Sequence, residues 1–124
     1  RRSYDEPGIN FFTEEGNSLQ LAYMRHPPGK RIEAHIHAPA RREIHDTQEV
    51  LVVVRGRLAA DFYDESQRYV TSLILNGGDV VLLMRGGHGF KALTEVEMWE
   101  CKQGPYNAER DKIRFDSLKA RQPS

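Results

Sequence analysis

Hydrophobic residues along the chain occur in short runs, and turn-forming residues separate one run from the next. Runs of about four to eight residues bounded by Gly, Pro, Asn or Asp are typical of β-strands. On this pattern we predict nine strands, over Ile9–Phe12, Leu19–Arg25, Arg31–His37, Glu49–Val54, Arg57–Tyr63, Arg68–Leu75, Asp79–Met84, His88–Leu93 and Val96–Lys102. Many short strands joined by tight turns predict an all-β sandwich or barrel.

The C-terminal segment has a different pattern. Asn107 can cap the sequence AERDKIRFDSL, in which Ile113, Phe115 and Leu118 fall close together at helical spacing. We therefore predict one short helix over residues 107–118. The connection 38–48, with the sequence APARREIHDTQ, is expected to be a long charged loop between two strands.

A chain of 124 residues is long enough to form one domain with its own core. We expect a single domain over 1–124, with a barrel over residues 19–102, a strand arm over 4–12 and a helical tail over 107–118. The strands EVLVVV and DVVLLM are apolar on both faces, so both faces must be covered. A second sheet covers one face and the short helix leaves much of the other exposed. We therefore predict a homodimer, with residues 4–12 along the partner's sheet edge.

The charge, hydropathy and cysteine content indicate which partners and which compartment to expect. The 18 basic and 18 acidic residues cancel, which argues against nucleic acid and anionic membranes as partners. No apolar run approaches the ~20 residues of a membrane span. A single cysteine, Cys101, excludes an intrachain disulfide and fits a reducing compartment, so we expect a cytoplasmic protein. The chain begins at Arg1 rather than Met, and we expect that its start has been trimmed.

Three ionisable residues alternate in the sequence EAHIH, namely Glu33, His35 and His37. Residues i and i+2 of a strand point to the same side, so the two imidazoles can lie side by side and bind one ion. The same alternation fits an amphipathic strand whose apolar residues face the core and whose polar residues face water. This segment alone leaves both interpretations open.

Other residues join these histidines in a recognisable order. Gly29, His35 and His37 precede the pair Glu49 and Gly56, and Gly78 precedes His88. These spacings resemble the two motifs of the cupin superfamily, whose members are small jelly-roll β-barrels that hold a metal through three His and one Glu. The resemblance covers about residues 29–102. It implies a cupin barrel in which His35, His37, Glu49 and His88 bind one metal ion.

The chain departs from the cupin motifs at three places. Eleven residues separate His37 from Glu49, where the family has three or four. The second motif is one residue short before His88, with Met84 in place of its Pro and Ala92 in place of its closing Asn. An insertion at a hairpin tip costs little stability. The shorter second motif bears more directly on the geometry of His88.

Three imidazoles and one carboxylate suit Fe(II), Mn(II), Ni(II), Co(II) or Zn(II), and the sequence does not distinguish among these ions. Four protein ligands leave positions for water, O₂ or substrate on an octahedral ion. His45 and Glu43, in the loop 38–48, are rival ligands.

Further candidates surround the expected metal site. Glu33 is a candidate catalytic base, and Tyr23, His45 and Phe90 are candidate pocket residues. Trp99 is expected in the core, as aromatic residues of strands generally are. Lys102 and Tyr106 flank the expected end of the barrel.

Three functions follow from the resemblance. The first is a metal-dependent enzyme acting on a small polar molecule, such as a carbohydrate or sugar-nucleotide derivative, with the loop 38–48 over the mouth of the site. The second is a ligand-binding or sensing cupin without turnover. The third is a metal-free sugar-nucleotide isomerase or epimerase with a histidine as general base. The tail EMWECKQGPYNAERDKIRF motivates this third function, because it resembles the tail of small bacterial cupins that accompany sugar-nucleotide and polysaccharide enzymes.

Overall fold

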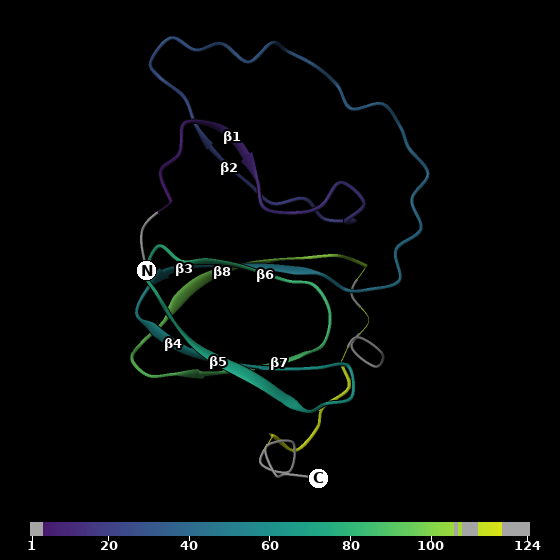
Figure 1. Cartoon of the computed structure of the whole chain (residues 1–124), viewed down its shortest axis with the longest axis vertical. Coiled ribbons are helices and arrows are strands. Elements are labelled where there is room, and N and C mark those ends of the chain that lie inside the picture. Colours follow the sequence, from purple (N-terminus) through teal and green to yellow (C-terminus); the bar gives the residue numbers. More distant parts are fainter. Residues whose placement is uncertain (1–3, 106, 108–111, 118–124) are drawn as a thin grey trace. The chain divides into compact units, whose positions relative to one another are not determined.

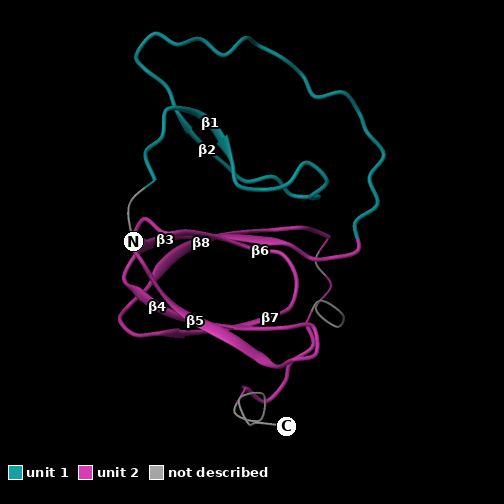
Figure 2. Ribbon diagram, in the orientation of Figure 1, with its two compact units in different colours: residues 1–44 teal, residues 45–124 magenta. Residues whose placement is uncertain are grey.

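The computed structural model describes residues 4–105, 107 and 112–117, and this part of the chain is all-β. Its strands are β1 (Gly8–Phe11), β2 (Ala22–Arg25), β3 (Glu49–Arg55), β4 (Arg57–Tyr63), β5 (Tyr69–Asn76), β6 (Val80–Leu83), β7 (Gly87–Ala92) and β8 (Glu97–Lys102). Eight of the nine predicted strands are therefore confirmed, and β4 has the predicted bounds. The chain divides into unit 1, residues 1–44, and unit 2, residues 45–124 (Figure 2).

Unit 1 contains one antiparallel hairpin. β1 pairs with β2 so that Gly8 lies opposite Arg25 and Phe11 lies opposite Ala22. The Tyr4 ring packs edge-on against Phe12 and Tyr23, with ring centroids 4.8 and 5.2 Å apart. Apart from this hairpin, the described part of unit 1 has no regular secondary structure.

The strand predicted over 31–37 is wrong, because these residues have no regular secondary structure. Ile32 and Ile36 are 57% and 92% exposed, so the apolar half of the alternation does not face a core. A strand needs a neighbour that hydrogen-bonds to its backbone. None of the described strands pairs with this segment.

Unit 2 consists of two three-stranded antiparallel sheets that face each other (Figure 1). β3 lies between β6 and β8 in one sheet, and β4 lies between β5 and β7 in the other. The buried core between the sheets comprises Val53, Leu58, Ala60 and Leu75, with Phe62, Val81 and Val96 packed against it. Because β3 and β4 are central strands, their inner faces carry most of the buried residues.

The described strands do not form the closed barrel that we predicted. Each sheet of unit 2 has only three strands, and β5, β6, β7 and β8 are edge strands without a second neighbour in the described part of the chain. The all-β class is confirmed, whereas barrel closure is not present.

The C-terminal helix predicted over residues 107–118 is also wrong where the structure describes residues 112–116, because these residues have no regular secondary structure. Residues 108–111 and 118 of the predicted helix, and residue 106 before it, lie outside the described part. Phe115 instead packs edge-on against Tyr63 of β4, with ring centroids 5.0 Å apart and an interplanar angle of 88°. Such a tertiary contact overrides the weak preference of a short segment for helix. The described residues contain no helix long and apolar enough to cross a membrane.

Candidate metal centre and adjoining groove

The candidate residues of unit 2 gather at one end of its two sheets. Glu49 begins β3 and lies opposite Leu83 of β6 on one side and Lys102 of β8 on the other. His88 is the second residue of β7 and lies opposite Phe62 of β4. We refer to this end of the sheets as the Glu49 end of unit 2.

A reciprocal pair of hydrogen bonds fixes the backbone next to Glu49. The Gln48 backbone N–H donates to Gln103 Oε1 at 2.9 Å, and the Gln103 backbone N–H donates to the Gln48 carbonyl oxygen at 3.1 Å. Gln48 is buried. These bonds join the start of β3 to the residue after β8, so they hold the Glu49 backbone in place.

Glu49 and His88 form a close, partly buried pair. His88 Nε2 lies 3.4 Å from Glu49 Oε2, and the side chains are 32% and 12% exposed. Two donors at about 2.1 Å from one ion lie about 3.0 Å apart at an octahedral angle of about 90° and about 3.4 Å apart at a tetrahedral angle. The measured separation therefore fits two ligands of one metal ion.

His35 and His37 form a second pair, in unit 1. Their ring centroids lie 5.2 Å apart, with the planes at 74°. Imidazoles bound to one ion have centres about 5 Å apart. His35 Nδ1 lies 2.8 Å from the Glu33 carbonyl oxygen. When Nδ1–H donates to this oxygen, the lone pair of Nε2 is free for a metal. The two imidazoles thus lie close together although the predicted strand does not form.

The four predicted ligands therefore occur as two pairs, one in each unit. Within the described part of the chain, no group of three or more His, Cys, Asp or Glu is arranged to hold a metal ion. The rival candidates Glu43 and His45 are exposed and belong to a segment without regular structure.

The other candidates lie in different environments. Phe90 stands beside His88 on β7, with ring centroids 5.3 Å apart. Tyr23 packs against Tyr4 in unit 1. The core placement of Trp99 is wrong, because this side chain is 71% exposed on the edge strand β8. Lys102 Nζ lies 3.9 Å from Glu100 Oε1, and Tyr106 lies outside the described residues.

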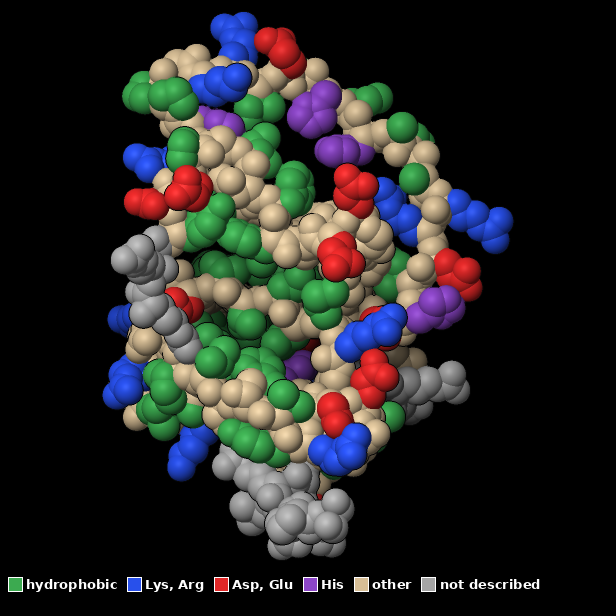
Figure 3. Space-filling view, viewed as in Figure 1, with side chains coloured by type: hydrophobic (Ala, Val, Ile, Leu, Met, Phe, Trp, Pro, Cys, Tyr) green, Lys and Arg blue, Asp and Glu red, His purple; other side chains and the backbone are tan. Residues whose placement is uncertain are grey.

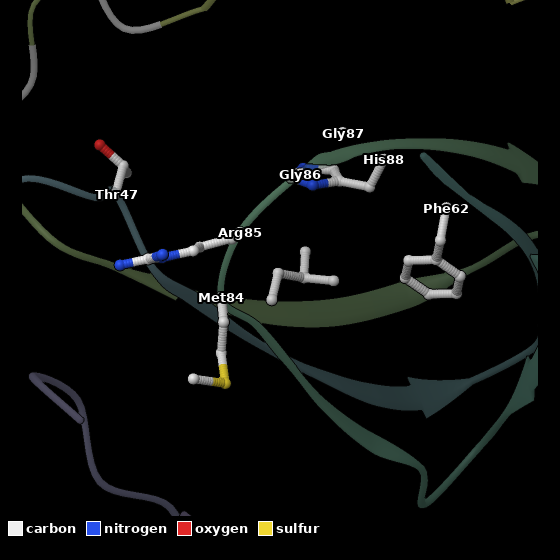
Figure 4. Close-up of a pocket in the computed structure, with 8 residues that line it drawn as sticks. Thr47, Phe62, Met84, Arg85, Gly86, Gly87 and His88 are labelled. Atoms are coloured by element: carbon white, nitrogen blue, oxygen red, sulfur yellow. The ribbon is translucent and has the colours of Figure 1, made fainter. Parts of the chain in front are cut away.

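A small cavity adjoins His88 at the Glu49 end (Figure 4). Its volume is about 30 Å³, and it is lined by Thr47, Phe62, Leu83, Met84, Arg85, Gly86, Gly87 and His88. Arg85 extends away from Phe62, toward the side on which Thr47 lies. A space of this size admits a water molecule but not a sugar ring.

An open groove of about 620 Å³ lies next to this cavity. It is lined by Asp46, Thr47, Asp64, Glu65, Gln67, Met84, Arg85, Gly86, Gly87, Ile113 and Phe115. Arg85 Nε lies 3.0 Å from Asp46 Oδ2, and the terminal nitrogen Nη1 of the same guanidinium lies 4.0 Å from Glu65 Oε1. Our sequence analysis did not identify Arg85. Its signal is the sequence RGGH, which places a cation directly before the glycine turn of the second motif.

Asp64 lines the groove, but its carboxylate belongs to a turn. Asp64 Oδ1 accepts hydrogen bonds from the backbone N–H groups of Ser66 and Arg68, both at 2.9 Å, and Oδ2 accepts one from Arg68 Nε at 3.1 Å. The hydrogen bond from the Arg68 backbone, helped by the charge of the same residue, holds the pKa of Asp64 below its ordinary value. The remaining carboxylates of the groove are those of Asp46 and Glu65.

Charged side chains of both signs are interspersed on the face of the molecule that Figure 3 shows. This agrees with a sequence in which acidic and basic residues are equal in number.

Comparisons of the chain with protein-family models, with curated proteins and with solved structures find no match. The functional assignment therefore depends on the spacing of the motif residues and on the local geometry described above.

Proposed function

We propose that this protein is a metal-binding cupin and an enzyme that acts on a small polar molecule of the carbohydrate class. In this proposal His35, His37, Glu49 and His88 are the ligands of one divalent transition metal. The observation that carries it is the partly buried Glu49–His88 pair, with Nε2 and Oε2 3.4 Å apart at the end of the two sheets.

Burial supports a bound cation at this pair. A carboxylate removed from water is costly unless it is paired or coordinates a metal. Glu49 is buried, and the side-chain partner of its carboxylate within the described part of the chain is the His88 imidazole at 3.4 Å. A divalent ion bound between them would offset the charge of the carboxylate and use the lone pair of the imidazole.

The His35–His37 pair supplies the remaining donors that the cupin resemblance implies. Its ring separation of 5.2 Å and the contact from His35 Nδ1 to the Glu33 carbonyl oxygen prepare two imidazoles for one ion. The proposal requires that both pairs meet at the same ion. The bound ion would supply Lewis-acid polarisation of a substrate oxygen.

A second candidate function uses the Glu49–His88 pair without a metal. A carboxylate beside an imidazole orients the ring and stabilises the imidazolium that forms when the ring accepts a proton. This arrangement suits a sugar isomerase or epimerase, in which His88 would remove a proton from the carbon next to a carbonyl group. Glu49 would then face the positive charge on His88.

Elemental analysis separates the two candidates. The full chain is purified without chelator or nickel resin, together with His88→Ala and His35→Ala, and with His45→Ala as the matched control. We expect about one metal ion per chain in the wild type and in His45→Ala. We expect the metal content per chain to fall at least tenfold in His88→Ala and in His35→Ala, because each variant lacks one of the four proposed donors.

Other outcomes contradict the proposal. A metal that stays in His88→Ala, or leaves only in His45→Ala, shows that the ligands were assigned wrongly. A metal-free wild type that exchanges solvent deuterium into a keto sugar, and loses this exchange in His88→Ala, establishes the second candidate in its place. Turnover of such substrates, measured on the metal-loaded chain, separates an enzyme from a ligand-binding or sensing cupin.

A further inference from the structure

The groove and the small cavity at the Glu49 end of unit 2 adjoin the same short segment of chain. Both are lined by Thr47 and by the segment 84–87. The cavity of about 30 Å³ ends at His88, whereas the groove of about 620 Å³ falls within the range of small-molecule sites, about 300–1,000 Å³. A ligand in the groove would therefore lie against the segment 84–87, which directly precedes His88.

The charges of the groove disfavour an anionic ligand. Its lining includes three carboxylates and one guanidinium. Asp46 already pairs with that guanidinium, Arg85, at 3.0 Å. A phosphate or diphosphate in the groove would face the carboxylates of Glu65 and Asp46, and the one cation among the described lining residues, Arg85, is already paired with Asp46. The negative charges of ligand and carboxylates would repel each other. A ligand that donates hydrogen bonds fits better, because bonds from a hydroxyl to a carboxylate are among the stronger ones.

The groove also has an apolar wall. Met84, Ile113 and Phe115 contribute to its lining. The Phe115 ring is held edge-on by Tyr63, with centroids 5.0 Å apart, and it lies over Gly87. A Cβ at Gly87 would meet the Phe115 ring at 2.9 Å, so the glycine makes room for the ring. An aromatic ring fixed in this way offers an apolar surface to the C–H face of a pyranose.

We propose that this groove binds an uncharged sugar or polyol, with the hydroxyl groups on Asp46 and Glu65 and a C–H face on Phe115, and that it excludes phosphorylated and nucleotide-linked sugars. The inference deepens the proposed function and rests on it only for the reaction at the His88 end. Binding in the groove itself needs no metal.

Isothermal titration calorimetry on the full chain tests this inference. The probes are free hexoses and 6-deoxyhexoses, each compared with its nucleoside-diphosphate ester at the same ionic strength. We expect at least one free sugar to bind, and its nucleotide ester to bind at least tenfold more weakly. Glu65→Lys should remove this preference, because it replaces an anion of the groove with a cation. Glu95→Lys, at an exposed carboxylate outside the lining, is the matched control.

Three results overturn the inference: no free sugar binds, the nucleotide ester binds more tightly to the wild type, or Glu65→Lys and Glu95→Lys behave alike. Metal content measured on the same samples keeps the two proposals apart. A chain that holds metal but binds no free sugar refutes the groove assignment alone. A chain that binds sugar without any metal refutes the metal site alone.

Discussion

The chain passes from β3 of one sheet to β4 of the other at Gly56, and replacing this residue by alanine should strongly destabilise unit 2. Gly56 has a φ of +96°, in the region that favours glycine. A Cβ at this position would overlap the Glu95 carbonyl oxygen and would lie 3.0 Å from Val96 Cα. Val96 packs against the core, so relief of the overlap must move a segment that the core holds in place.

The structure offers a control that separates backbone conformation from overlap. Gly78 has a φ of +92°, similar to that of Gly56, but a Cβ there meets nothing within 4 Å. Alanine in this conformation costs about 1–2 kcal/mol. We therefore expect Gly78→Ala to lose about 1–2 kcal/mol. Gly56→Ala should lose about 3–4 kcal/mol, because the overlap with backbone atoms adds to that cost.

Urea unfolding followed by circular dichroism measures both variants. The difference of about 2 kcal/mol corresponds to roughly 8–16 °C in Tm for a unit of this size. The m-values should agree with that of the wild type, since the surface exposed on unfolding is unchanged. Equal losses in Gly56→Ala and Gly78→Ala would refute the reasoning, because the overlap with Glu95 would then contribute nothing.

Two further predictions concern charge and assembly. Asp64→Asn should lower the stability of the folded chain at neutral pH, because the folded pKa of Asp64 lies below its ordinary value of 3.8. The stability that the Asp64 carboxylate contributes is therefore complete above pH 3.8 and disappears as the pH falls through the folded pKa. Acid unfolding curves of variant and wild type should therefore converge at low pH, and a gap that persists there contradicts this assignment. We expect a homodimer through the outer face of the β6–β3–β8 sheet, where Val80, Val52 and Trp99 lie side by side in the pairing register. Light scattering should give twice the chain mass for the wild type and one chain mass for Trp99→Arg, and a wild type that stays at one chain mass as its concentration rises excludes the dimer.

The strands of unit 2 could be predicted from the sequence because local signals define them. β4 begins after Gly56 and ends before the turn at Asp64, and its buried residues Leu58 and Ala60 alternate as the strand period requires. A turn residue at each end and a period of two between them are properties of the chain alone. The predicted bounds of β4 were therefore correct.

The failed predictions involve partners that are distant in the chain. The alternation in EAHIH describes which side chains share a side, but a strand also needs a neighbour, and the sequence does not state which one. Trp99 was placed in the core from its residue type. Its register partner is Val52, which lies between the buried residues of β3 and points to the outer face, so Trp99 faces away from the core. The helix over 107–118 failed at Phe115, since the contact with Tyr63 depends on the fold of β4.

The candidate site shows how one short turn can serve two neighbouring spaces. Gly86 has a φ of +84°, and the Tyr63 carbonyl oxygen occupies the place that a Cβ would need. Only glycine allows this close approach, which holds the connection between β6 and β7 against the end of β4. Arg85 precedes this glycine and contacts Asp46 at the groove, while His88 follows it and contacts Glu49. A side chain at position 86 would therefore disturb the Arg85 guanidinium at the groove and the His88 imidazole of the candidate site together, so the sequence RGGH links these two places.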